Sequence, residues 1–231
     1  MKNVMVDHTQ LHRDGYALLR GAIPKQWLAA LQSAFDAGVI PSAQWPVPRG
    51  NDWRHSLLDH DPQVQAVCRL PGLLAVAGEL IGERFFLAQV EGREPVAGGG
   101  HQRLHRDLSA QRPGDSVGAL AFLDDYGPTN GATRIVPASH RQRPGEPAFD
   151  FDDESHSEQL SGAAGDILVF DFDLVHAGSL NLTDARRRTL LISYFAESLH
   201  AAQAQTASLR NVRMATDERF DPHRGPAADQ A

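Results

Sequence analysis

Apolar residues follow two kinds of pattern along the chain, helical before residue 84 and strand-like after it. Leu28, Leu31 and Phe35 share one face of a helix expected over about 25–37, because apolar positions three or four apart lie on the same side of a helix. Helices are also predicted over 61–69 and 71–81. Later apolar runs alternate with turn sequences, which is typical of strands. These runs are 85–90, 104–108, 117–123, 133–136, 167–170 and 189–195.

Many short strands with few helices between them indicate a mainly β fold with N-terminal helices, in the form of a two-sheet, cupin-like jelly roll. The 231 residues suffice for one sizeable core, so we expect a single domain over 1–231. It would consist of a helical part over about 1–83, a jelly-roll core over about 84–200, and a loose tail from about 221. The segment 41–51 contains three prolines and is expected to be a long ordered loop.

The composition gives no sign of a nucleic-acid or membrane partner, and it indicates the cellular compartment. The net charge of −7 and the pI of about 5.8 give no reason to expect nucleic acid or an anionic membrane as partner. Cys68 is the one cysteine, so no internal disulfide is possible, which suits a reducing cytoplasm. Neither a secretory segment after Met1 nor an apolar run long enough to span a bilayer is apparent. We therefore expect a cytoplasmic protein, either a monomer or a homodimer.

The strongest chemical signal is His105-Arg106-Asp107 together with the distant His176. On a strand, residues i and i+2 point to the same face, so His105 and Asp107 could face one metal ion while Arg106 points away. Two imidazoles and one carboxylate form the facial triad of mononuclear non-haem iron sites. Short His-x-Asp strings are also common by chance on polar strand ends, so the motif needs its context.

That context is the run from 165 to 195. A Gly165-Asp166 turn precedes an apolar strand, His176 follows it, and a run of three arginines at 186–188 opens the next apolar strand. An arginine in that place can hold a carboxylate through two parallel hydrogen bonds. A co-substrate that chelates iron at one end and has a free carboxylate at the other needs such a group.

The chain resembles the phytanoyl-CoA dioxygenase family of iron(II)- and 2-oxoglutarate-dependent oxygenases. The resemblance rests on Arg187 and on four segments: LHRDGYALLRGAIPKQWLAALQSAF (11–35), QRLHRD (102–107), NGATRIVPASH (130–140) and GDILVFDFDLVHAGSLN (165–181). It implies a double-stranded β-helix, iron(II) held by His105, Asp107 and His176, and 2-oxoglutarate and O2 as co-substrates. It also implies that Arg187 binds the distal carboxylate of 2-oxoglutarate. The expected reaction hydroxylates a C–H bond and releases succinate and CO2.

The chain departs from the family pattern at one position that matters. The family often has Ser or Thr two residues after the distal histidine, as a second donor to the carboxylate, whereas this chain has Gly178 and then Ser179. Either Ser179 substitutes through a local bulge or another donor serves. Gln102, within the QRLHRD match, is a further candidate for contact with 2-oxoglutarate or substrate. Asp107 is present, where a small residue would have suggested a halogenase.

The sequence says less about the identity of the substrate and about which segment covers the pocket. We expect a small free molecule, such as an amino-acid derivative or secondary metabolite, because no basic patch suited to the phosphates of coenzyme A is apparent. Two segments are candidates for a mobile cover, the loop 45–55 and the acidic stretch 150–158. Their plainer interpretations are a loop anchored to the core by Trp45 and Trp53, and a solvated loop.

Two other function classes remain open. A metal hydrolase or isomerase on the same jelly roll could use His105, Asp107 and His176 to hold zinc and an activated water. A cupin-like binding protein could retain these residues as a vestigial site. Neither class would need Arg187, so binding of 2-oxoglutarate separates both from the oxygenase.

Overall fold

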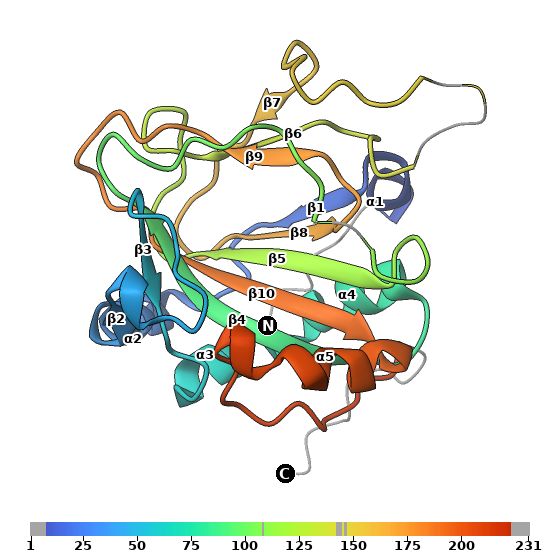
Figure 1. Ribbon diagram of the computed structural model, residues 1–231, viewed down its shortest axis with the longest axis horizontal. Helices are drawn as coiled ribbons and strands as arrows, with labels where there is room; N and C mark the ends of the chain where they lie inside the picture. Colours follow the sequence, from blue (N-terminus) through green and yellow to red (C-terminus); the bar gives the residue numbers. More distant parts are fainter. Residues whose placement is uncertain (1–7, 108, 142–144, 146, 223–231) are drawn as a thin grey trace.

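The computed structural model describes residues 8–107, 109–141, 145 and 147–222, and its described part is built on two antiparallel sheets that face each other (Figure 1). The larger sheet has the strand order β1-β8-β5-β10-β4-β3-β2, and the smaller has the order β7-β6-β9. The jelly roll predicted from the strand pattern is therefore confirmed.

The strands are β1 (Tyr16–Leu19), β2 (Val39–Ile40), β3 (Trp53–Ser56), β4 (Phe85–Pro95), β5 (Ser116–Phe122), β6 (Thr133–Ile135), β7 (Glu158–Gln159), β8 (Ile167–Asp171), β9 (His176–Gly178) and β10 (Thr189–Ala196). The α-helices are α1 (His8–Asp14), α2 (Leu28–Gly38), α3 (Pro62–Val67), α4 (Pro71–Ile81) and α5 (His200–Thr206). Short 3-10 helices are η1 (Lys25–Trp27), η2 (Ser42–Gln44), η3 (Glu197–Leu199) and η4 (Ser208–Arg210).

The central strands of the larger sheet are buried on both faces. Successive residues of a strand point to opposite faces, so they belong to two separate core clusters. In β8, Ile167 and Val169 belong to the cluster shared with the helices, whereas Leu168 and Phe170 belong to the cluster between the sheets. The helix-covered cluster also contains Leu73, Val76 and Ile81 of α4. Figure 1 shows α3 and α4 on the side of the larger sheet away from the smaller one. The inner face of the larger sheet is thus left to line a site.

Helix ends follow from local chemistry. The carboxylate of Asp61 accepts hydrogen bonds from the backbone N–H groups of Gln63 and Val64, which caps α3 at its N-terminus. Gly82, with φ of 73°, ends α4 in the left-handed conformation that glycine adopts without steric cost. The predicted helix over 71–81 has the same bounds as α4.

One predicted strand, 104–108, is wrong over its described residues. That segment is extended, but it forms a single isolated bridge, in which His105 and His176 exchange two backbone hydrogen bonds of 3.0 and 2.9 Å. The neighbouring strand β9 has only three residues, so it offers few backbone partners for a longer ladder. Residue 108 lies outside the described residues. His176, expected to follow a strand, is the first residue of β9.

The N-terminal part contributes more than helices. β1 pairs with β8, and β3 pairs with β4, so residues before 84 extend both sides of the larger sheet. The last three residues of the suggested cover 45–55, which are Trp53, Arg54 and His55, belong to the sheet strand β3. Trp45 is 3% exposed and anchors the segment that precedes β3.

Within the described residues, no helix is both long and apolar enough to cross a bilayer.

The acidic stretch 150–158, the other suggested cover, is attached by ion pairs to segment 102–106 and to β6. Asp152 pairs with Arg103 through contacts of 2.6 and 2.5 Å, and Glu154 pairs with Arg134. The rings of Phe149 and Phe151 pack against the cluster that contains Leu104. A role of this stretch as a cover stays a prediction.

Candidate functional site

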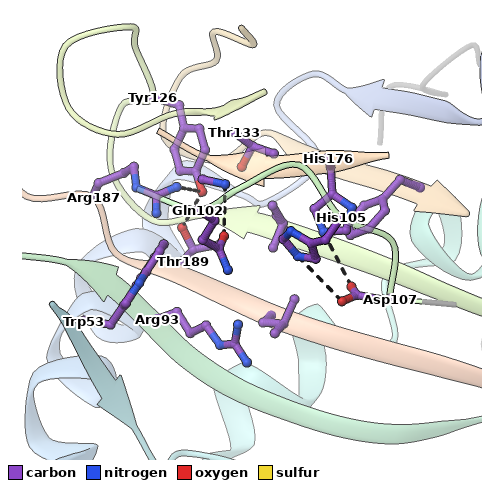
Figure 2. A pocket seen from close by; sticks show the side chains of 14 residues that line it. Trp53, Arg93, Gln102, His105, Asp107, Tyr126, Thr133, His176, Arg187 and Thr189 are labelled. Carbon is purple, nitrogen blue, oxygen red and sulfur yellow. Dashed lines mark hydrogen bonds and ion pairs between the residues drawn. The ribbon is translucent and has the colours of Figure 1, made fainter. Parts of the chain in front are cut away.

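The side chains of His105, Asp107 and His176 meet at the inner face of the larger sheet (Figure 2). Each offers one ligand atom, and the three atoms lie within 4.8 Å of one another. One carboxylate oxygen of Asp107 is 3.5 Å from Nε2 of His176, and the other is 4.0 Å from Nε2 of His105. His105 comes from the extended segment and His176 from β9. The backbone bridge between these two residues therefore brings their imidazoles together.

Both imidazoles are oriented by backbone carbonyls. Nδ1 of His105 lies 2.9 Å from the carbonyl oxygen of Arg103, and Nδ1 of His176 lies 3.0 Å from that of Leu174. A carbonyl oxygen can only accept, so each Nδ1 carries a proton, and each Nε2 has a free lone pair when the ring is neutral. Histidine ligands of metals are commonly fixed in this way.

The environment of His176 favours its neutral form. Burial lowers the pKa of His176, and the nearby positive charge of Arg93 acts in the same direction, whereas Asp107 opposes both. A neutral imidazole is the form that binds a metal ion. Arg106 points away from the site, as the i, i+2 spacing predicts. Its guanidinium donates to the carbonyl of Ser139 and lies 5.7 Å from the ring of Phe151.

Arg187 reaches the same pocket from the segment before β10 and is only 2% exposed. Its guanidinium lies 4.5 Å from the ring centre of Tyr126 and 5.4 Å from that of Trp53. Burial lowers its pKa, but arginine remains protonated in proteins. Among the described residues, no carboxylate pairs with it, and its Nε has no hydrogen-bond partner. The pocket therefore contains a buried cation whose charge no described side chain neutralises.

The two neighbouring arginines explain how Arg187 is positioned. Arg186 pairs with Asp36 at 2.7 Å and also with Glu94, and Arg188 pairs with Asp124 at 2.8 Å. These ion pairs fix the chain on both sides of Arg187 and leave it alone to face the pocket.

Three residues with hydroxyl groups line the pocket that Arg187 enters, and none of them was predicted from the sequence. Nη1 of Arg187 donates to the hydroxyl of Tyr126, which lies 3.0 Å from Oγ1 of Thr189, and Thr133 lines the same pocket. Thr189 could have been found, because it lies two residues after Arg187 where the next strand begins. Tyr126 lies in a loop whose sequence contains no such signal.

Gln102 and Ser179, both predicted to contact the co-substrate, have different positions. Gln102 lines the pocket, and its Oε1 accepts a hydrogen bond of 3.0 Å from the backbone N–H of Gly178. Ser179 does not line the pocket, because His176 and Gly178 of β9 face it and the next residue faces the opposite side. Its hydroxyl is buried without a partner among the described residues.

The cavity around these residues has a volume of about 110 Å³. This is enclosed space on the scale of small molecules. Leu120, Phe170 and Leu191 form its apolar wall, and Arg93 and Trp53 complete the side formed by β4 and β3. Arg93 was not predicted as a pocket residue, whereas Trp53 lies in the segment suggested as a cover, for which anchoring to the core was the plainer interpretation.

The family described as Phytanoyl-CoA dioxygenase (PhyH) matches residues 11–189 of this chain. A curated relative, the Fe(II)/2-oxoglutarate-dependent dioxygenase nvfF of Aspergillus novofumigatus, is 38% identical over 97 residues, which cover 38% of this chain and 31% of the relative. The L-proline trans-4-hydroxylase of Streptomyces griseoviridis is 26% identical over 176 residues, covering 61% of this chain and 65% of the relative. The chain thus spans less than two thirds of either relative.

Among solved structures, EctD from S. alaskensis with bound Fe superposes with a TM-score of 0.66 at 20% sequence identity. The match covers 83% of this chain and 76% of that protein. At this identity the similarity concerns the fold, and it agrees with the two-sheet architecture described above.

Proposed function

The chain belongs to the phytanoyl-CoA dioxygenase family, and on this basis we propose that it is an iron(II)- and 2-oxoglutarate-dependent dioxygenase that hydroxylates a C–H bond of a small molecule. The names of its relatives support this reaction class, since they include a 2-oxoglutarate-dependent dioxygenase and a proline hydroxylase. We also propose that the described chain works as one catalytic domain, with its site between the two sheets.

One observation carries the proposal: the buried Arg187 shares a pocket with the three possible metal ligands and has no carboxylate partner among the described residues. Leaving a buried charge unpaired costs several kcal/mol. The carboxylate of a bound ligand would remove that cost. A co-substrate that reaches both the metal and Arg187 fits this pair of features. A zinc hydrolase or a vestigial binding protein gives no reason for the buried cation, so neither alternative is favoured.

His105, Asp107 and His176 would hold the iron, because neutral imidazoles and one carboxylate suit iron(II) and leave coordination positions open. When bound, iron(II) and 2-oxoglutarate supply the activation of O2 for hydroxylation, with succinate and CO2 as co-products. Arg187 would bind the distal carboxylate of 2-oxoglutarate, and the hydroxyl of Tyr126 would orient the guanidinium. The amide nitrogen of Gln102 would add a donor where the family often has Ser or Thr. The apolar wall would hold the carbon skeleton of the substrate and exclude water.

The test is an anaerobic titration of the apo-protein with iron(II) and then 2-oxoglutarate, followed by the visible metal-to-ligand charge-transfer band. We expect a band in the wild type and none in His176→Ala. Arg187→Ala should retain bound iron but require about 100-fold more 2-oxoglutarate, because it removes a bidentate charge-assisted contact. Arg84→Ala is the matched control, since that arginine pairs with Glu197 at 3.3 Å, does not line the pocket and is distant in sequence from Arg187. A wild-type protein that binds iron but shows no band with 2-oxoglutarate would disprove the proposal.

The substrate would be a small free molecule, and the cavity volume and the net charge of −7 support this expectation over a nucleic acid. The cytoplasmic location and the monomeric or homodimeric state stay predictions.

A further inference from the structure

A second arginine lines the pocket, and neither the metal ligands nor the co-substrate accounts for it. Arg93 is on the inner face of β4, directly opposite Thr189 of β10 on one side and His55 of β3 on the other. Figure 2 shows its side chain between Trp53 and Asp107, across the pocket from Tyr126 and Thr133. Arg93 therefore faces the metal ligands from the wall formed by β4.

Arg93 is only partly neutralised by the protein. Its Nε lies 2.5 Å from Oε1 of Glu91, a carboxylate that is 1% exposed. The other oxygen of Glu91 pairs with Arg49 at 2.8 Å. Burial alone would raise the pKa of Glu91, but Arg93 and Arg49 lower it below the ordinary value, so the carboxylate is charged. Two guanidinium groups thus share one carboxylate, and a net positive charge remains.

Arg93 lines the pocket, and its terminal nitrogens are open to a ligand. Within the described residues, Nη1 and Nη2 donate no hydrogen bond, and the side chain is 33% exposed, compared with 2% for the whole of Arg187. A guanidinium with a free pair of parallel N–H groups matches the two oxygens of a carboxylate. The pocket thus has two cationic sites, one deep at Arg187 and one more open at Arg93.

We propose that the substrate carries a carboxylate and that Arg93 binds it, so that the apolar part of the substrate lies along Leu120, Phe170 and Leu191 beside the metal ligands. This inference rests on the proposed function. One 2-oxoglutarate would use one end on iron and its distal carboxylate on Arg187, so both of its charged ends are satisfied without Arg93. Among the described residues that line the pocket, Asp107 is the one acidic residue, and none of these residues pairs with the free guanidinium end.

The test uses matched pairs of probes that differ only in charge: L-proline with L-prolinamide, cyclohexanecarboxylate with cyclohexanecarboxamide, and phenylacetate with phenylacetamide. Succinate release is measured above the background without probe, in the presence of iron(II), 2-oxoglutarate and O2. We expect at least one acid to stimulate release while its amide does not. In Arg93→Gln the half-saturating concentration of that acid should rise at least about tenfold, whereas Arg93→Lys should show a smaller rise.

Arg49→Gln is the matched control, because it removes the other partner of Glu91 without changing a pocket residue. It should leave the response to the acid within about twofold of wild type. Arg93→Gln should still fold, since Glu91 retains Arg49, and its thermal melting checks this. If Arg93→Gln does not fold, Arg93→Lys carries the test.

Other results would overturn either this inference or the proposed function. Amides that stimulate as well as acids, a panel in which no acid stimulates, or equal responses of Arg93→Gln and wild type would overturn the carboxylate assignment. One further case is that Arg93 contacts 2-oxoglutarate and not the substrate. An anaerobic titration with 2-oxoglutarate tests it. If Arg93→Gln weakens the charge-transfer response at least about tenfold, Arg93 contacts 2-oxoglutarate, and this inference fails while the proposed function stands. Absence of the band in wild type would instead reject the proposed function.

Discussion

The hydroxyl of Tyr126 accepts a hydrogen bond from Nη1 of Arg187, and the ring of the same tyrosine lies 4.5 Å from the guanidinium. One residue therefore contacts the buried cation both through its polar end and through its π face, which attracts a cation. The hydroxyl is also 3.0 Å from Oγ1 of Thr189. The guanidinium is thus oriented without a carboxylate that would neutralise it.

The first prediction follows from this relationship. Tyr126→Phe keeps the stacked ring, which lies 3.8 Å from that of Phe122, but removes the hydroxyl. The 2-oxoglutarate concentration at half saturation should rise about fivefold to tenfold, as expected for the loss of one hydrogen bond to a charged group, while iron binding is unchanged. Tyr194→Phe is the control, because its hydroxyl donates to the carbonyl of Cys68, away from the pocket. Equal 2-oxoglutarate affinity in wild type and Tyr126→Phe would contradict the orienting role.

The second prediction concerns Gly178, where many family members have a hydroxyl residue. A Cβ at this position would lie 2.6 Å from the backbone oxygen of Gly100, 3.0 Å from Oε1 of Gln102 and 3.2 Å from the ring of Trp53. Gly178→Ser should therefore not restore a second donor. It should lower the free energy of unfolding by about 1–3 kcal/mol and weaken 2-oxoglutarate binding, because the backbone oxygen cannot move cheaply. Urea unfolding and the anaerobic titration measure the two effects, and tighter binding would show that the segment adapts.

The third prediction tests Ser179 directly. Its hydroxyl is buried without a partner among the described residues and lies outside the pocket. Ser179→Ala should leave 2-oxoglutarate affinity within about twofold of wild type. It should leave stability unchanged or raise it by up to about 1 kcal/mol, because it removes an unsatisfied buried polar group. A loss of 2-oxoglutarate affinity would reinstate Ser179 as a co-substrate contact.

The fourth prediction is a pH dependence of stability. Burial lowers the pKa of His55 to about 4, with Arg93 and Arg49 adding to the effect and Glu91 opposing it. The folded-state pKa lies below the unfolded value of about 6.5, so the unfolded chain binds the extra proton first as pH falls. Stability from neutral His55 is fully present above pH 6.5 and is lost progressively as pH falls toward about 4.

His55→Phe isolates this contribution, since a ring is retained next to Trp45 and no titration remains. Unfolding measured by calorimetry from pH 7 to pH 4 should show a steeper loss in wild type than in the variant, by about 3 kcal/mol. Parallel curves for the two proteins would mean that His55 titrates alike in the folded and unfolded chains.

Local patterns predicted most of the central elements because they depend on residues close in sequence. The apolar runs at 167–170 and 189–195 correspond to β8 and β10, since a strand buried on both faces reads as an uninterrupted apolar run. The strand over 104–108 failed because its backbone meets β9 at one bridge only, and pairing depends on the length of the partner rather than on the segment itself. The strands β1, β2, β3, β7 and β9 were missed because two to four residues form a weak pattern; among strands this short, β6 was predicted.

The sequence by itself determined the class of chemistry, because the His105, Asp107 and His176 set and the arginine after it are matters of residue type and order. Only the tertiary structure decided how the pocket is completed. It brought Tyr126, Thr133, Trp53 and Arg93 to that set from separate loops and strands, and it turned Ser179 away. The reason is that a pocket wall depends on which strands pair and in which register, and register joins residues that no local pattern relates.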